Sequence, residues 1–392
     1  MSQQPSSSRT SQARRFGSET TGINVSPSHR AQSNQPFRPL PPPTGPSPYH
    51  LSLDNILPAD LLSQIRASGR IVFHMGGDTG GVRSAQPQQI VAMKMEEQFN
   101  LPNAADRPAF FYHLGDVVYY YGESSEYYPQ FYEPYAHYPA PIFAIPGNHD
   151  GDVQDPGTPS LTAFVENFCA TAPHLTSEAG DVARDSMTQP NVYWTLDAPF
   201  VTIIGLYTNI PEGGQIDDQQ TAWFTNELAT APREKAVLVA AHHPPYSADV
   251  HHGGSAYMKQ LIDQAAQTAG RMPDMVLSGH IHDYQRFTRQ VNNGWEVPYI
   301  VAGGSGYWNL HYVYNSPDGT DLPTPYQVPN SDVTLESYQD HRHGFMRLVV
   351  GPRGIAGEYF TAPRPQESWT AAAERTDAFA VDLNAHKMVK QQ

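Results

Sequence analysis

Six side chains that can bind metal ions follow directly after short apolar segments of this chain. They are Asp78, Asp116, Asn148, His242, His280 and His282. Carboxylate and amide oxygens together with imidazole nitrogens suit iron, zinc or manganese better than copper or a calcium cage. The set is large enough for two metal ions ~3.5 Å apart, which share a bridging carboxylate and support in-line displacement at phosphorus.

Each of these residues alone has a purely structural explanation. Gly-Asp is a common turn pair, so Asp78 and Asp116 could be turn residues. A histidine before Pro-Pro, such as His242, could be a satisfied core or loop residue. His280 and His282, however, form a His-x-His pair whose side chains project to one side of a strand end, which core packing does not require. The combination therefore favours a metal site.

The segments that precede these residues are typical of buried β-strands. They are RIVFHMGGD, AFFYHLGD, APIFAIPGNHD, KAVLVAAHH and DMVLSGHIH. In layered α/β folds, ligand sites form outside the carboxyl ends of the strands, so we expect the five ends to meet in one crevice. Crossover helices are expected around QQIVAMKMEEQF and QQTAWFTNEL, and further strands at FVTIIGLY, VPYIVAGG, GFMRLVVG and IAGEYF.

The remaining stretches are predicted from composition. Residues 1–47 are rich in Ser, Pro and Gln, which predicts a disordered tail before a catalytic domain at 48–392. A helix is expected in LDNILPADLLSQIRASG. The polar stretches 151–199 and 309–343 are predicted to form loops and short helices over the site, where substrate choice would be set.

The order of five motifs resembles that of the calcineurin-like metallophosphoesterases, and within them the purple acid phosphatases. The motifs are GDTG at 77–80, GDVVY at 115–119, GNHD at 147–150, AHHP at 241–244 and GHIH at 279–282. This resemblance implies an α/β fold, namely a four-layer α/β/β/α sandwich with a dinuclear metal site at the carboxyl ends of the strands.

The resemblance also implies which residues bind which metal ion. Asp78, Asp116, Tyr119 and His282 would hold the first ion. Asp116 would bridge to a second ion, whose site is completed by three more residues, Asn148, His242 and His280.

Tyr119 is the residue that points to the purple acid phosphatases. Many members of the wider superfamily have a metal-binding histidine where this chain has Gly80, and in the purple acid phosphatases a tyrosinate on iron replaces it. This predicts iron in the first site, and iron, zinc or manganese in the second. Tyr119 is followed by Tyr120 and Tyr121, so the spacing could slip by one, and an aromatic cluster over the core is the alternative interpretation.

Three further histidines are candidates for catalysis. His149 would donate to the phosphate, with Asp150 or another carboxylate fixing its tautomer. His251 and His252 lie at the spacing of the family's substrate-facing histidines, and one of them could protonate the leaving alcohol, although a solvated HHGG loop needs no function.

Charge limits the possible partners. The formal net charge is −15 and no Lys/Arg cluster stands out, which argues against nucleic acid or an anionic membrane as a partner. A small phosphorylated substrate could bind if bound cations supply positive charge. The single cysteine, Cys169, excludes an intramolecular disulfide and a thiolate cluster. The sequence gives no indication of the oligomeric state.

Targeting signals are not evident in the sequence. No run of about eighteen apolar residues occurs, and the first residues have basic side chains without an apolar segment behind them. The expectation is therefore a cytoplasmic protein by default, with export by another route left open.

The expected function is a metal-dependent phosphoesterase, of the acid phosphatase type, that hydrolyses phosphomonoesters with a metal-bound hydroxide. Two alternatives stay open. One is a phosphodiesterase or nucleotidase on the same metal pair, and the other is a binding module that kept the fold and lost turnover.

Overall fold

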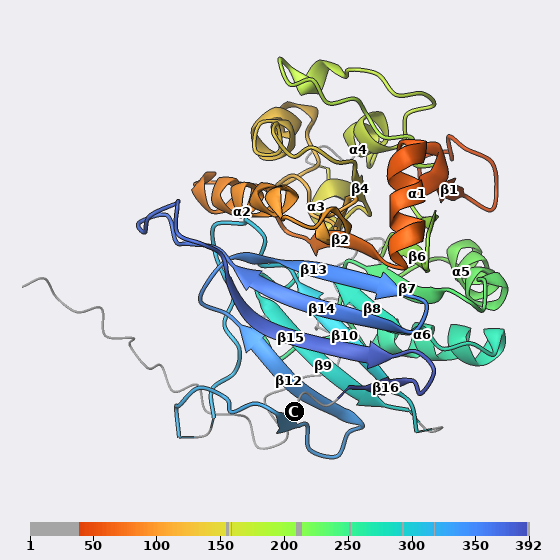
Figure 1. The fold of residues 1–392 in the computed structure, drawn as a ribbon, viewed down its shortest axis with the longest axis vertical. Coiled ribbons are helices and arrows are strands. Elements are labelled where there is room, and N and C mark those ends of the chain that lie inside the picture. Colours follow the sequence, from red (N-terminus) through yellow and green to blue (C-terminus); the bar gives the residue numbers. More distant parts are fainter. Residues whose placement is uncertain are drawn as a thin grey trace, which may run out of the picture.

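The computed structural model describes residues 39–389, except residues 154–156, 158, 209–213, 251, 292–293 and 317. Within the described residues, the strands form one sheet of nine strands and one of seven (Figure 1). The helices are α1 (Ala59–Ser68), α2 (Gln86–Glu97), α3 (Asn148–Gly151), α4 (Thr162–Phe168), α5 (Asp218–Thr230) and α6 (Ala256–Ala269).

The seven-stranded sheet combines a parallel and an antiparallel part. Its order is β16 (Lys387–Met388), β15 (Glu374–Asp382), β14 (Gly354–Thr361), β13 (Gly344–Gly351), β2 (Ile71–Gly76), β3 (Phe111–His113) and β4 (Ile142–Ala144). Strands β2, β3 and β4 are parallel to one another. Their carboxyl ends therefore lie at the same edge of the sheet.

The nine-stranded sheet has a second parallel block at its centre. Its order is β1 (His50–Ser52), β5 (Trp194–Ala198), β6 (Val201–Leu206), β7 (Ala236–Ala241), β8 (Met275–Ser278), β10 (Glu296–Ala302), β9 (Tyr284–Gln290), β12 (Val333–Gln339) and β11 (Tyr326–Gln327). Strands β6, β7, β8 and β10 are parallel.

Alternate side chains of the central strands pack into two different cores, because successive residues of a strand point to opposite faces. Phe73 of β2 and Leu238 of β7 belong to the core between the sheets. Val237 of β7 instead packs in the core that includes Phe224 of α5 and Ile262 of α6. Helices α1 and α2 contact β2 and β13 of the other sheet. The layers are thus helices, sheet, sheet and helices, and the predicted fold class is confirmed.

The five predicted strand segments correspond to β2, β3, β4, β7 and β8, and the two predicted crossover helices correspond to α2 and α5. The prediction for the polar stretches was wrong in part, because 151–199 contains β5 and 309–343 contains β12. Strand β12 is paired with β9 through its backbone, and most of its side chains are only half-buried. A half-buried strand can contain polar residues, which is why the sequence of this segment resembles that of a loop.

Contacts reach further toward the N-terminus than the predicted domain boundary at residue 48. The backbone N–H groups of Thr44 and Gly45 donate to the carbonyl of Pro190 at 3.0 and 2.9 Å, and Leu40 packs against the core. Residues 1–38 of the predicted tail lie outside the described residues.

Among the described residues, no helix combines the length and the apolar character that crossing a bilayer requires. The side chain of Cys169 is buried, with its Sγ 3.5 Å from the carbonyl of Asn191.

Candidate metal centre

The two parallel blocks deliver their polar side chains to one place. Asp78 follows β2, Asp116 follows β3, Asn148 begins the turn after β4, and His242 follows β7. The loop after β8 adds His280 and His282. Two carboxylates and one imidazole of this group belong to residues with left-handed backbone, since φ is 57° at Asp78, 53° at Asp116 and 67° at His280. Non-glycine residues adopt such values at a cost, and they are concentrated at functional sites.

Tyr119 lies between Asp78 and His282. Its hydroxyl oxygen is 3.4 Å from Oδ1 of Asp78 and 3.4 Å from Nε2 of His282. Those two atoms are themselves 3.6 Å apart. Tyr119 is 2% exposed, whereas Tyr120 and Tyr121 are 36% and 42% exposed. Of the three consecutive tyrosines, Tyr119 is the one that the fold directs toward the group.

The ring of Tyr119 occupies the space beside Gly80. A Cβ atom at residue 80 would lie 2.6 Å from Cδ2 of Tyr119 and would also collide with Oε1 of Gln130. Gln130 holds the Tyr119 backbone by accepting from its N–H at 2.9 Å and donating to its carbonyl at 3.1 Å. A histidine at residue 80 would therefore require the Tyr119 ring and the Gln130 side chain to shift.

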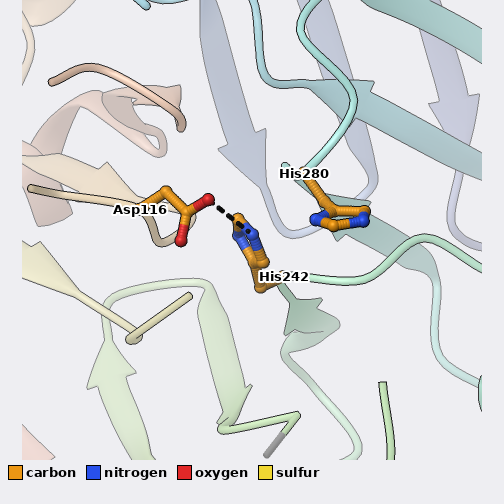
Figure 2. A group of neighbouring side chains, drawn as sticks. All are labelled: Asp116, His242 and His280. Carbon is orange, nitrogen blue, oxygen red and sulfur yellow. Dashed lines mark ion pairs between the residues drawn. The ribbon is translucent and has the colours of Figure 1, made fainter. Parts of the chain in front are cut away.

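The second group of side chains centres on Asn148. Its Oδ1 lies 3.1 Å from Nε2 of His242 and 3.0 Å from Nδ1 of His280. The same Nε2 of His242 is 3.3 Å from Oδ2 of Asp116. Figure 2 shows Asp116, His242 and His280 together, with the ion pair as a dashed line, and one ligand atom of each lies within 4.8 Å of the others.

Two of the imidazoles are oriented by backbone carbonyls. Nδ1 of His242 lies 2.8 Å from the carbonyl of Leu114, and Nδ1 of His282 lies 3.2 Å from the carbonyl of Asn309. A ring that donates from Nδ1 carries its lone pair on Nε2, the atom that faces the cluster in both residues. Burial lowers the pKa of both His280 and His282 well below the usual value, so these rings are neutral and can act as ligands.

The cluster is rich in buried negative charge. Burial raises the pKa of Asp78 well above its usual value, and the neighbouring Asp116 raises it further. Burial opposes ionisation of Asp116 too, but His242 and His149, through their charges and hydrogen bonds, together outweigh this and lower the pKa. For His242 burial lowers the pKa, and Asp116 and Asp78 together raise it to about 9. A bound cation would supply the positive charge that stabilises both carboxylates.

The separations between these atoms fit metal coordination. Oxygen and nitrogen ligands ~2.1 Å from one ion are ~3 Å apart when they meet it at right angles. The two groups show separations of 3.0 to 3.6 Å, around Tyr119 in one and around Asn148 in the other. The donor set and its geometry therefore fit two adjacent metal ions.

His149 lies next to the cluster, but its partner differs from the expected one. Its Nδ1 is 3.0 Å from the carbonyl of Tyr120, and its ring centre is 4.6 Å from that of Tyr119. The expected partner of His149 was Asp150 or another carboxylate, whereas the contact of its Nδ1 is with a backbone carbonyl. The carboxylate of Asp150 instead accepts backbone N–H groups of Gly147, Val117 and Val118, which ties together the loops after β3 and β4.

Of the two histidines considered as proton donors to the leaving group, the structure describes only His252. The ring of His252 is 5.1 Å from that of His280 between centres, which places it beside the cluster. His251 lies outside the described residues.

Sequence reasoning missed three residues at the site. His311 stacks on His282 with ring centres 4.3 Å apart, and Nδ1 of His311 is 3.4 Å from Oδ2 of Asp249. Tyr307 lies with its ring centre 4.4 Å from His282 and 4.4 Å from Tyr119. None of the three stands in a recognisable motif, and the only signal was that His311 falls in the stretch predicted to lie over the site.

Comparison with known proteins places these motifs in a family. Residues 77–284 match the calcineurin-like phosphoesterase family. The chain belongs to this family, since the match covers more than half of it.

Curated relatives include several purple acid phosphatases. Probable purple acid phosphatase 20 of Arabidopsis thaliana is 29% identical over 177 residues, which are 43% of this chain and 37% of the relative. Acid phosphatase A of Cryphonectria parasitica is 26% identical over 210 residues, 42% of this chain and 41% of the relative. The chain thus spans about two fifths of the length of these relatives.

A solved structure supports the fold. The purple acid phosphatase PPD1 from yellow lupin seeds aligns with a TM-score of 0.57 at 15% identity, over 80% of this chain and 54% of that chain. At this identity the similarity shows a shared fold.

Proposed function

We propose that this protein is a metal-dependent phosphomonoesterase of the acid phosphatase type. The observation that carries the proposal is the convergence of two groups of ligand atoms, around Tyr119 and around Asn148, in a chain of the calcineurin-like phosphoesterase family. Its substrate would be a small phosphorylated molecule.

Two metal ions would be held by the residues of the two groups. Asp78, Tyr119 and His282 would bind the first, and Asn148, His242 and His280 the second, with Asp116 as the bridging carboxylate. Metal ions bound there would polarise the phosphoryl oxygens and lower the pKa of the attacking water. Iron is proposed for the first site because a buried phenolate oxygen suits it, and iron, zinc or manganese for the second.

The remaining histidines would act on the substrate directly. With Nδ1 of His149 on the carbonyl of Tyr120, its Nε2 remains for a phosphoryl oxygen, where it would stabilise developing charge. His252, beside His280, would give its proton to the oxygen of the departing alcohol. His251 is the alternative donor.

The test is hydrolysis of p-nitrophenyl phosphate by the purified full chain, together with its metal content. We expect turnover in the wild type and loss of nearly all of it in His282→Ala, with one metal ion fewer per chain. His341→Ala, which removes a half-exposed histidine paired with Asp340, is the matched control and should keep turnover. An active His282→Ala variant would refute the proposal.

Two alternatives have their own readouts. Preference for bis-p-nitrophenyl phosphate or for nucleotides would indicate the phosphodiesterase or nucleotidase. A protein that binds two metal ions and turns over none of these substrates would be the binding module. All seven ligand positions are filled in this chain, which favours an enzyme.

A further inference from the structure

Two loops that approach the candidate metal centre are joined to each other by backbone pairing. The first follows β7 and includes residues 244–250 and 252–255, and the second follows β10 and includes residues 303–314. Asp249 and Val313 form an antiparallel bridge. On either side of it, the N–H of Val250 donates to Tyr312 at 3.1 Å and the N–H of Tyr314 donates to Ala248 at 2.9 Å. The two loops therefore form one unit.

The carboxylate of Asp249 lies inside this unit and contacts His252 and His311. It is 1% exposed. Its Oδ2 accepts the backbone N–H of His252 at 2.7 Å and lies 3.4 Å from Nδ1 of His311. A second antiparallel bridge, between Ala248 and Gly253, closes the turn that carries His252. One carboxylate oxygen thus fixes the turn from within.

His311 connects this turn with the metal centre. Its ring centre is 4.3 Å from that of His282 and 5.0 Å from that of His252. Its backbone N–H donates to the carbonyl of His282 at 2.9 Å, and its Nδ1 lies 3.4 Å from the backbone N–H of His282, so both the backbone and the ring of His311 contact that residue. His311 is 7% exposed, so its ring is largely shielded from solvent while it contacts the other two rings.

We propose that Asp249 and His311 are positioning residues that hold His252 against the leaving-group oxygen of the substrate. This inference rests on the proposed function. In the reaction, the oxygen of water forms a bond to phosphorus and the ester P–O bond breaks. The departing oxygen takes a proton from His252, and the proton that the attacking water gives up returns to His252 through solvent, so the products are phosphate and an alcohol.

If His252 protonates the leaving group, the effect of misplacing it depends on which alcohol the ester releases. An alkoxide is a poor leaving group and needs the proton as its bond breaks, whereas p-nitrophenolate is stable without one. Misplacing His252 should therefore slow the hydrolysis of alkyl phosphates much more than that of p-nitrophenyl phosphate. A variant that only loosened the fold would slow both reactions by the same factor.

The experiment compares kcat/KM for glycerol 2-phosphate and p-nitrophenyl phosphate in the full-length protein. Asp249→Ala and His311→Gln should each lower the value for glycerol 2-phosphate on the order of 10- to 100-fold and that for p-nitrophenyl phosphate about 2- to 3-fold. Asp249→Asn should recover part of the loss, because its amide oxygen can still accept the N–H of His252. His311→Gln carries the test if Asp249→Ala does not fold.

Asp377→Ala is the matched control. Asp377 also has a largely buried carboxylate in an ion pair, with Arg286 at 2.7 Å, on strand β15. Its loss should lower the melting temperature without changing the ratio between the two substrates.

A double-mutant cycle separates positioning from other roles. If Asp249 acts through His252, adding Asp249→Ala to His252→Ala should not change the substrate ratio further. Equal losses on both substrates in the single variants, or additive changes in the double variant, would overturn the inference. A wild-type protein that hydrolyses neither substrate would instead refute the proposed function.

Discussion

The strand ends and the joined loops over them differ in how they hold their side chains. At the strand ends, Asp78, Asp116 and His280 have left-handed backbone, and their side chains are almost fully buried. In the loops, His252 depends on a side chain, Asp249, and on pairing between segments far apart in the sequence. Under the proposed function, the strand ends would hold the metal ions and the loops would set the choice of ester. Metal ligands need a rigid layer, because coordination tolerates only small displacements.

The largest expected effect comes from removing a ligand at the strand ends. Asp116→Ala should lower kcat/KM for p-nitrophenyl phosphate on the order of 10³-fold or more, since Asp116 contacts His242 and also accepts the N–H of His149 at 2.8 Å. Steady-state kinetics and elemental analysis check this. The same loss in the Asp377→Ala control would mean that global destabilisation, and not the missing ligand, is the cause.

Tyr119→Phe is a finer change at the same strand ends. It keeps the ring that packs against His149 and Tyr307 and removes only the oxygen beside Asp78 and His282. We expect about 10- to 100-fold weaker binding of the first metal ion and loss of any tyrosinate-to-iron absorption band.

Tyr121→Phe is the control for Tyr119→Phe, because Tyr121 is 42% exposed. It should retain metal, colour and turnover. A colourless wild-type protein with two zinc ions and full activity would contradict the iron assignment and leave the phosphoesterase proposal intact.

Chelation tests the strand ends without a mutation. Prolonged dialysis against a chelator should abolish turnover, and added iron, zinc or manganese should restore it, because the buried carboxylates of Asp78 and Asp116 need a cation beside them. Full activity in protein that elemental analysis shows to be free of metal would contradict the proposed mechanism.

A smaller effect is expected at the loop surface. Tyr307 covers the rings of Tyr119 and His282, and its hydroxyl lies 3.0 Å from that of Tyr120. Tyr307→Ala should change the ratio of KM values for phenyl phosphate and glycerol 2-phosphate by about 2- to 10-fold, the size of one aromatic contact. Tyr307→Phe keeps the ring and should change it less. An unchanged ratio of KM values in both variants would mean that Tyr307 does not influence substrate choice.

The same contrast explains what the sequence could predict. The buried strands β2, β3, β4, β7 and β8 are nearly continuous apolar runs followed by Asp, Asn or His, which comes directly after Gly in every case except β7. Their type and the convergence of their ends therefore follow from local pattern and parallel topology. The strands and the meeting of their ends were predicted for this reason, whereas the four-layer arrangement was predicted from the resemblance of the five motifs to the calcineurin-like metallophosphoesterases.

The loops could not be predicted in this way. His311 reaches the site only because residues 312–314 pair with residues 248–250, and this pairing spans ~60 positions without a local signature. The contact between Asp150 and His149 that was considered from the sequence is missing for a related reason. Asp150 adjoins His149 in sequence, but its carboxylate satisfies backbone N–H groups left by two neighbouring loops.

The smallest effect is expected at His50 on β1, which belongs neither to the strand ends at the candidate metal centre nor to the joined loops. Nδ1 of His50 is 2.8 Å from Asp197 and its Nε2 is 2.7 Å from Glu227. The hydrogen bonds to Asp197 and then to Glu227 raise the pKa of His50 from 6.5 to about 10. A raised pKa means that folding favours the protonated ring, so its stabilising effect is fully present below pH 6.5 and is lost as pH rises through about 10.

His50→Gln should therefore lower the free energy of unfolding by about 1 kcal/mol near pH 6, a modest value because the ring is 39% exposed and solvent screens the ion pairs. The deficit should shrink toward pH 10, while turnover stays at the wild-type level. Denaturant unfolding at several pH values measures it. A deficit that is constant with pH would mean that packing of β1 on β5, and not the charge on the imidazole, stabilises this edge of the sheet.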